Sequence, residues 1–244
     1  MNKYQNIKMR KIINYCTCIT IMLVTFYTFF YCNKINLYKI SEIEIYGNEF
    51  VDNNTIKKIV NNKIKNKNIF TLQTNSINND ITNNQFIQSS QTYTTFPATI
   101  SIIINEIKPL ALFEENSNYY LIDDNYKQIQ ASINAINYFS VPILSMEKNI
   151  QRDYNKLIDI LKYTNINNIK LYKSIKEIKV SDNYIYFIIQ DNTMIKLSNT
   201  NLENNIYKLI EFVKMIGDRK RISSYKYINL SIPNQIIVKE KNII

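Results

Sequence analysis

The 244-residue sequence contains no histidine and no tryptophan, only two glycines and only three cysteines. Without histidine, a Ser-His-Asp or Cys-His nucleophile system and a His-ligated metal site are both excluded. Gly47 and Gly217 alone cannot form the glycine-rich loop that lets backbone approach a phosphate, which excludes P-loops and dinucleotide-binding fingerprints. We therefore predict a protein that is not an enzyme, with no catalytic residue, cofactor, metal site or small-molecule substrate.

Charge and composition argue against nucleic-acid binding. Lysine and arginine number 30 against 20 aspartates and glutamates, a formal net charge of +10. Isoleucine, asparagine, lysine and tyrosine are abundant, and all four have AT-rich codons, so genome base composition accounts for much of this excess. Lysine without arginine forks is a weak nucleic-acid signature, and we predict no nucleic-acid partner.

The N-terminal region has the pattern of a membrane anchor. Residues 1–11 are basic and contain no acid, whereas residues 12–32, from Ile12 to Cys32, carry no charge. A helix of this length spans about 31 Å, which matches the hydrocarbon core of a bilayer. The pattern predicts a cytoplasmic basic tail at 1–11, a single transmembrane helix at 12–32 and a linker at 33–39. By the positive-inside rule, the rest of the chain lies outside the cytoplasm.

A cleaved signal peptide is the alternative to an anchor. Its apolar core is shorter, about 7–15 residues, and ends at a small-residue cleavage site. Here the apolar stretch is longer and ends in Tyr31 and Cys32, which favours an uncleaved anchor. All three cysteines lie within this stretch, so the exported part contains no thiol and is held together by its core alone.

Residues 40–106 have the pattern of a β-α-α-β-β module. Residues 40–46 alternate apolar and acidic side chains, as in a half-buried strand. Gly47 suits the following turn, and Asp52 can cap a helix. A second helix with a Thr74 or Asn75 cap precedes strands at 88–95 and 99–106. The inward-facing residues expected in the two helices and the last strand are Ile56, Ile59, Val60, Ile64, Ile77, Ile81, Ile100, Ile102 and Ile104.

Residues 107–244 predict a second module of mixed β-structure with two helices. Apolar residues at helical spacing mark the two helices, at 151–163 and 202–216, and Gly217 closes the second. Alternating segments bounded by polar turns mark the strands, which we place at 110–114, 119–123, 127–131, 174–180, 184–190, 193–197, 225–230 and 235–239.

This layout resembles the FtsQ/DivIB family of bacterial cell-division proteins. Short stretches match the family in order and spacing, among them Ile43-Glu44-Ile45-Tyr46-Gly47-Asn48, Asn68-Ile69-Phe70-Thr71-Leu72, Phe96-Pro97-Ala98-Thr99-Ile100, Asn105-Glu106-Ile107-Lys108-Pro109-Leu110-Ala111, Val141-Pro142-Ile143-Leu144 and Pro233-Asn234-Gln235-Ile236-Ile237-Val238. In the family the first stretch opens a POTRA module and residues 141–144 correspond to a loop. The sequence departs from the family at Lys108, Asn125, Asn229 and Ser231.

The resemblance implies an α+β protein with one N-terminal transmembrane helix, a POTRA-like domain at 40–106 and a β domain at 107–244. It also implies a non-enzymatic scaffold of the divisome, anchored in the inner membrane with its bulk in the periplasm at the septum. The implied partners are FtsB/FtsL-like bitopic proteins and other division components, and through them the septal peptidoglycan synthases. A POTRA-bearing translocation or outer-membrane assembly factor is the alternative, and a membrane-anchored cell-wall hydrolase is a third possibility.

The last strand is the predicted partner-binding element. A terminal strand is often at a sheet edge, where unpaired backbone groups can accept a strand from another protein. Burial of the strand under the chain's own C-terminus is the alternative. The candidate partner-binding residues are Tyr227, Leu230, Ile232, Asn234, Gln235, Ile236, Ile237, Val238 and Lys239.

Two carboxylate pairs and one charge run have simpler interpretations than function. Glu114-Glu115 and Asp123-Asp124 could suggest an acid/base pair, but adjacent residues of a strand point to opposite faces. We interpret both pairs as solvated turn residues. The run at 218–221 could contact anionic lipid or an acidic partner, and we interpret it as a solvated loop.

Overall fold

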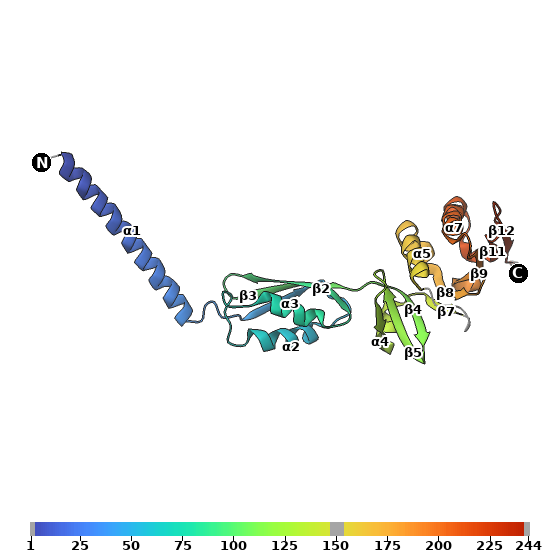
Figure 1. Cartoon of the computed structure of the whole chain (residues 1–244), viewed down its shortest axis with the longest axis horizontal. Helices are drawn as coiled ribbons and strands as arrows, with labels where there is room; N and C mark the ends of the chain where they lie inside the picture. The colour runs from blue at the N-terminus through green and yellow to red at the C-terminus, as the bar shows by residue number, and fades with distance from the viewer. Residues whose placement is uncertain (1–2, 147–153, 242–244) are drawn as a thin grey trace. The chain divides into compact units, whose positions relative to one another are not determined.

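The computed structural model describes residues 3–146 and 154–241, and the chain divides into two compact units (Figure 1). The first unit is Met1–Glu106 and the second is Ile107–Ile244. Residues 151–153, the start of the helix predicted at 151–163, therefore lie outside the described residues. The fold is α+β, as predicted, and each unit has its own hydrophobic core.

The N-terminal helix α1 (Lys3–Lys34) is long and apolar enough to cross a membrane. The apolar part of the segment Met9–Lys34 has a mean hydropathy of 1.6, and no residue in this part is buried against the rest of the chain. The hydroxyls of Thr17, Thr20, Thr25 and Thr28 donate to carbonyls of the preceding helical turn. Because hydrocarbon offers no partner to a polar group, this internal pairing suits a helix in a bilayer.

The rest of the first unit has the predicted β-α-α-β-β order. Its elements are β1 (Glu42–Tyr46), α2 (Asn53–Ile64), α3 (Thr74–Thr82), β2 (Ile87–Thr95) and β3 (Thr99–Glu106). The sheet order is β1-β3-β2, with β1 parallel and β2 antiparallel to the central β3. Side chains at two-residue spacing on β3 pack against α2 and α3. The fully buried residues on these three elements are Ile56, Val60, Ile77, Ile81, Ile100, Ile102 and Ile104.

The two helix starts of this unit differ in how well the sequence predicted them. The Asp52 side chain accepts a hydrogen bond from Asn54 N at 3.0 Å, as expected of a cap. The predicted Thr74 or Asn75 cap is wrong, because the helix already includes both residues and Gln73 precedes it without a side-chain cap bond. Polar residues crowd this start, so residue type alone does not identify the cap.

Residues 38 and 39 belong to the first module rather than to the predicted linker. Tyr38 is buried in the core of this unit, and Lys39 forms an antiparallel bridge with Asn68. Ile69 N also donates to Tyr38 O at 3.1 Å. Only residues 35–37 therefore separate the end of α1 from the module.

The part of the second unit that the structure describes contains one nine-stranded mixed sheet in the order β12-β11-β10-β9-β8-β7-β4-β5-β6. The strands are β4 (Pro109–Glu115), β5 (Asn118–Asp123), β6 (Gln128–Gln130), β7 (Ile143–Met146), β8 (Ile175–Val180), β9 (Tyr184–Ile189), β10 (Met194–Ser198), β11 (Tyr225–Asn229) and β12 (Ile237–Glu240). All eight predicted strands are present. The ninth, β7, lies where we expected a loop, because four residues after a proline show no clear alternation.

The described part of this unit has four α-helices, not the two predicted. The predicted pair corresponds to α5 (Tyr154–Asn167) and α7 (Leu202–Ile216), which lie against the sheet (Figure 1). The additional α4 (Ile133–Phe139) and α6 (Ile169–Ser174) span two turns or fewer, too short for a helical period to register. Each begins at a side-chain cap, Ser132 and Asn168 respectively.

Tyr172 makes the core of the second unit sensitive to high pH. Burial raises the pKa of its phenol from 10 to about 12, and its hydroxyl donates to Leu110 O at 3.1 Å. The folded state therefore keeps a proton that the unfolded chain releases near pH 10. The contribution, about 3 kcal/mol, is present below pH 10 and is lost as the pH rises through 12.

We expect Tyr172→Phe to flatten the fall in stability between pH 10 and 12. The measurement is denaturant unfolding of the second unit at several pH values, with Tyr207→Phe, a change at an exposed tyrosine, as control. Equal slopes for Tyr172→Phe and the unmodified chain would contradict the assignment to Tyr172.

Candidate partner-binding edge

Strand β12 is reached through a polar turn. The Asn229 side chain at the end of β11 accepts hydrogen bonds from Ser231 N and Ser231 Oγ, at 2.9 and 2.7 Å. Asn234 then adopts a positive φ of 59°. Short polar side chains bond to nearby backbone and tolerate this conformation, so the sequence here reverses the chain and brings β12 back antiparallel to β11.

The sheet order makes β12 an edge strand, and its register shows which backbone groups are free. Leu230 N donates to Lys196 O of β10, so the N–H and C=O of the alternate residue, Asn229, point toward β12. Asn229 is opposite Ile237, whose backbone groups therefore face β11. Lys241 N donates to Ser224 O, which agrees with this alternation. Val238 and Glu240 consequently present their N–H and C=O groups to the open edge.

Some of the predicted partner-binding residues are buried and others are exposed. Leu230 is 1% exposed and belongs to the core, so its side chain is not available to a partner, and Tyr227 is half-buried. The other seven are exposed, including four aliphatic side chains at 37–39% exposure: Ile232, Ile236, Ile237 and Val238. Aliphatic side chains so close together on an open edge are an unusual surface for a protein without a partner.

Lys241, which the sequence did not single out, and Lys220 of the charge run hold this edge in place. Lys241 Nζ donates to the carbonyls of Asp191 and Ser223, at 2.6 and 2.7 Å. Lys220 forms an ion pair with Glu240, so the charge run at 218–221 is not simply a solvated loop. A basic residue next to a strand has no distinctive pattern, and the sequence carried no signal for these contacts.

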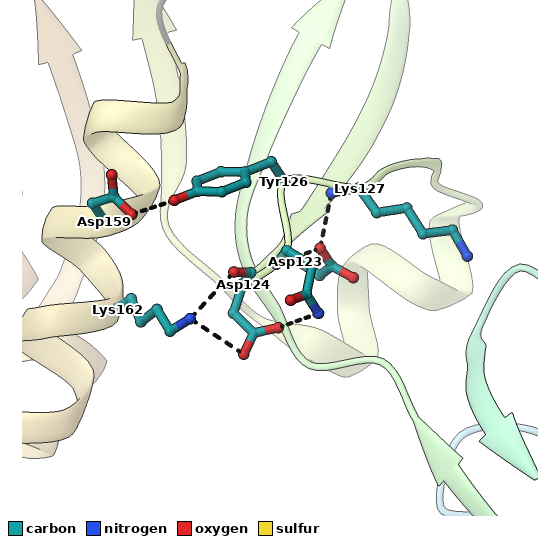
Figure 2. A network of polar contacts seen from close by, with 7 residues as sticks. Asp123, Asp124, Tyr126, Lys127, Asp159 and Lys162 are labelled. Atoms are coloured by element: carbon teal, nitrogen blue, oxygen red, sulfur yellow. Dashed lines mark hydrogen bonds and ion pairs between the residues drawn. The ribbon is translucent and has the colours of Figure 1, made fainter.

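The Asp123-Asp124 pair forms a structural latch rather than an acid/base site (Figure 2). Asp123 is buried, and one carboxylate oxygen accepts from Asn125 N and Lys127 N at 2.9 and 2.8 Å. The expectation of a turn is correct, but for Asp123 the expectation of solvation is wrong, because the carboxylate bonds to turn backbone instead of water. Asp124 lies 3.9 Å from the ammonium of Lys162 on α5.

Tyr126 completes this latch between the β5–β6 turn and α5. Its hydroxyl donates to Asp159 Oδ1 at 2.5 Å, and this hydrogen bond raises the pKa of Tyr126 (Figure 2). Across residues 3–146 and 154–241, no three acidic or cysteine side chains are grouped as metal ligands.

Comparison with known proteins agrees with this architecture. Residues 38–106 match the model of the FtsQ-type POTRA domain. Cell division protein FtsQ of Rickettsia bellii is 25% identical over 206 residues, covering 83% of this chain and 73% of that protein. Cell division protein DivIB of Clostridium tetani is 29% identical over 207 residues, covering 78% of this chain and 77% of that protein.

Among solved structures, the major extracytoplasmic domain of the division protein DivIB from Geobacillus stearothermophilus aligns with a TM-score of 0.33 and 7% identity. It covers 48% of this chain and 99% of that one, a likeness too slight for comparing details. The curated relatives span both units and the POTRA match falls on the module built from β1, α2, α3, β2 and β3. The chain therefore contains an FtsQ-type POTRA domain at residues 38–106 and is similar over most of its length to the cell-division proteins FtsQ and DivIB.

Proposed function

We propose that this protein is a non-enzymatic scaffold of the divisome that binds other division proteins by adding their strands to β12. Helix α1 anchors it in the inner membrane, and the basic residues in the first turns of this helix, up to Lys11, keep the N-terminus in the cytoplasm. Both units then lie in the periplasm, at the division septum. FtsB/FtsL-like bitopic proteins are the proposed partners at the edge, and through them the scaffold links to the septal peptidoglycan synthases.

The observation that carries the proposal is the open edge at Val238 and Glu240. A partner strand laid along it satisfies these outward N–H and C=O groups, which supplies affinity independent of sequence. The exposed aliphatic side chains around the edge supply specificity. Lys241 and Lys220 hold β12 in the sheet beforehand, so less conformational entropy is lost when a partner binds.

The alternative of a translocation or assembly factor has less support. That class is expected to carry repeated POTRA modules or long barrel strands of about ten residues. In the described residues after position 106, the strands instead form a single mixed sheet and are three to seven residues long. The Rickettsia bellii and Clostridium tetani relatives are division proteins.

The decisive variant is Val238→Pro, because proline removes the outward N–H of residue 238 and leaves the N–H groups of Ile237 and Lys239 bonded to β11. We expect it to weaken capture of a co-expressed FtsB/FtsL-type pair at least tenfold, a loss of ~1.4 kcal/mol or more. The measurement is binding of the full-length chain in detergent.

Two control variants separate backbone from side chain. Val238→Ala keeps the N–H and should retain most binding, whereas Ile237→Pro removes an inward N–H and should detach β12 itself. Hydrogen exchange of β11 reports whether the sheet is intact in each variant. Full binding by Val238→Pro with an intact sheet would overturn strand addition. Depletion in the native cell that leaves division normal would overturn the septal role.

A further inference from the structure

Three segments of the first unit meet beside the end of the anchor helix, and we refer to residues 33–41, 64–71 and 95–98 as the anchor-proximal face. Ile40 N donates to Lys67 O at 3.3 Å, and Ser41 N donates to Ala98 O at 3.0 Å. Residues 38–41 thus lie between the other two segments. The face begins one residue after Cys32, where the uncharged stretch of the anchor ends.

Aromatic rings are exposed on this face. The Tyr38 ring lies 5.2 Å from the ring of Phe70, 5.7 Å from that of Phe96 and 5.7 Å from that of Phe29 in α1. Phe70 is 60% exposed and Phe96 is 67% exposed. Large aromatic rings are costly in water but favourable at the boundary between lipid headgroups and acyl chains. Their position next to the anchor places them at that depth.

The same face is basic. Its three segments contain Lys34, Lys39, Lys65 and Lys67 and not one aspartate or glutamate. In the described part of the chain, neither Lys39 nor Lys67 has an ion-pair partner. Basic residues close to a membrane are each worth about 1 kcal/mol of attraction to anionic lipid.

A cavity of about 220 Å³ opens among these lysines. It is lined by side chains that can donate hydrogen bonds or carry positive charge: Asn33, Asn36, Lys39, Asn66, Lys67 and Asn68. A cavity of this volume has room for a phosphate group. Amide and ammonium donors without a carboxylate favour an anion over a cation.

We propose that the anchor-proximal face binds an anionic phospholipid of the bilayer that holds α1. The phosphate occupies the cavity between Lys39 and Lys67, and Phe70 and Phe96 insert at the headgroup boundary. The occupant is lipid because the site lies at the end of the apolar span, where lipid phosphates surround it. Such contacts fix the POTRA module against the membrane surface. This inference rests on the proposed anchoring by α1.

Reporter variants test the insertion. The chain has no tryptophan, so Phe70→Trp and Phe96→Trp each create a single fluorescent probe in the full-length protein. The matched control is Tyr207→Trp, at an exposed tyrosine of α7 in the second unit. In nanodiscs of phosphatidylcholine with phosphatidylglycerol, brominated lipid should quench the probes at 70 and 96 and leave the probe at 207 unquenched.

Charge variants test the phosphate site. Lys39→Gln with Lys67→Gln should lower the preference for phosphatidylglycerol over phosphatidylcholine about fivefold for each lysine, as ~1 kcal/mol per basic residue implies. Lys57→Gln with Lys58→Gln changes the net charge equally on exposed residues of α2 and should have little effect. Lipid retained by the purified protein, measured by native mass spectrometry, gives the preference.

The outcomes separate this inference from the anchor on which it rests. A chain that does not enter nanodiscs would overturn the anchoring by α1. A chain that enters nanodiscs but leaves the probes at 70 and 96 unquenched would overturn lipid binding by this face and leave the anchoring by α1 intact. Equal effects of the two lysine pairs would show a general attraction to positive charge and would overturn the phosphate site. Displacement of the bound lipid by inorganic phosphate at equal concentration would reject lipid as the occupant.

Discussion

Replacing Gly47 by alanine is expected to destabilise the POTRA module by about 3–5 kcal/mol. Gly47 follows β1 with a φ of +82°, which strains any residue with a Cβ. A Cβ there would also clash with Ile104 O, a backbone atom of the central strand. Since Tyr46 pairs with Ile103 in the parallel ladder, neither β1 nor β3 can move away without breaking their hydrogen bonds.

Gly217→Ala provides the matched control for this prediction. Gly217 also has a positive φ, of +52°, but no atom lies within 4 Å of the position that its Cβ would take. Gly217→Ala should therefore lower the stability of the second unit only by the backbone strain, about 1–3 kcal/mol. Hydrogen exchange in denaturant, measured separately on peptides from each unit, gives both values. A cost at Gly47 no larger than that at Gly217 would show that the contact with Ile104 O is unimportant.

Replacing Glu106 by alanine is expected to cost the POTRA module about 3 kcal/mol. Its two carboxylate oxygens accept hydrogen bonds from Phe50 N at 2.8 Å and Val51 N at 2.7 Å. Two backbone donors of the loop before α2 are thus held by the last residue of β3. No neutral side chain of similar size offers two acceptors in this geometry.

Glu106→Gln tests whether the second acceptor oxygen matters. Glutamine keeps the shape but places an NH₂ group against one of the two donors, so we expect it to recover less than half of the loss. Glu114→Gln, at an exposed position on β4, is the control for removing one negative charge. The same hydrogen-exchange experiment, read at the peptide containing Phe50 and Val51, gives the result. Full stability of Glu106→Gln would contradict the importance of the paired acceptors.

Local pattern was sufficient for most of the architecture. The uncharged stretch at 12–32 identifies a helix by its length and its lack of charge. The period-two alternation on β3 and the helical spacing in α7 each identify an element because burial of one face repeats at the period of the element itself. The order of the POTRA module followed from these elements. Elements too short to repeat their pattern were missed: α4, α6 and β7.

Single-residue environments were less predictable than elements. Asp123 looks like any turn aspartate, but it is buried and its carboxylate accepts hydrogen bonds from backbone N–H groups of its own turn. Leu230 looks like part of the exposed final segment, but it packs in the core. Lys241 and Glu106 act on residues brought near them only by the sheet. In each case the deciding partner is set by three-dimensional position, which side-chain type does not encode.

The sequence by itself determined that an apolar helix precedes two modules and that a strand lies at about 235–239. Only the tertiary structure decided that this strand is at the edge of the sheet and that Val238 and Glu240, rather than Ile237, offer their backbone groups outward. The physical reason is that periodicity is a local property of the chain, whereas strand order and register result from pairing with distant segments. One residue of register exchanges the bonded and the free backbone groups of the edge.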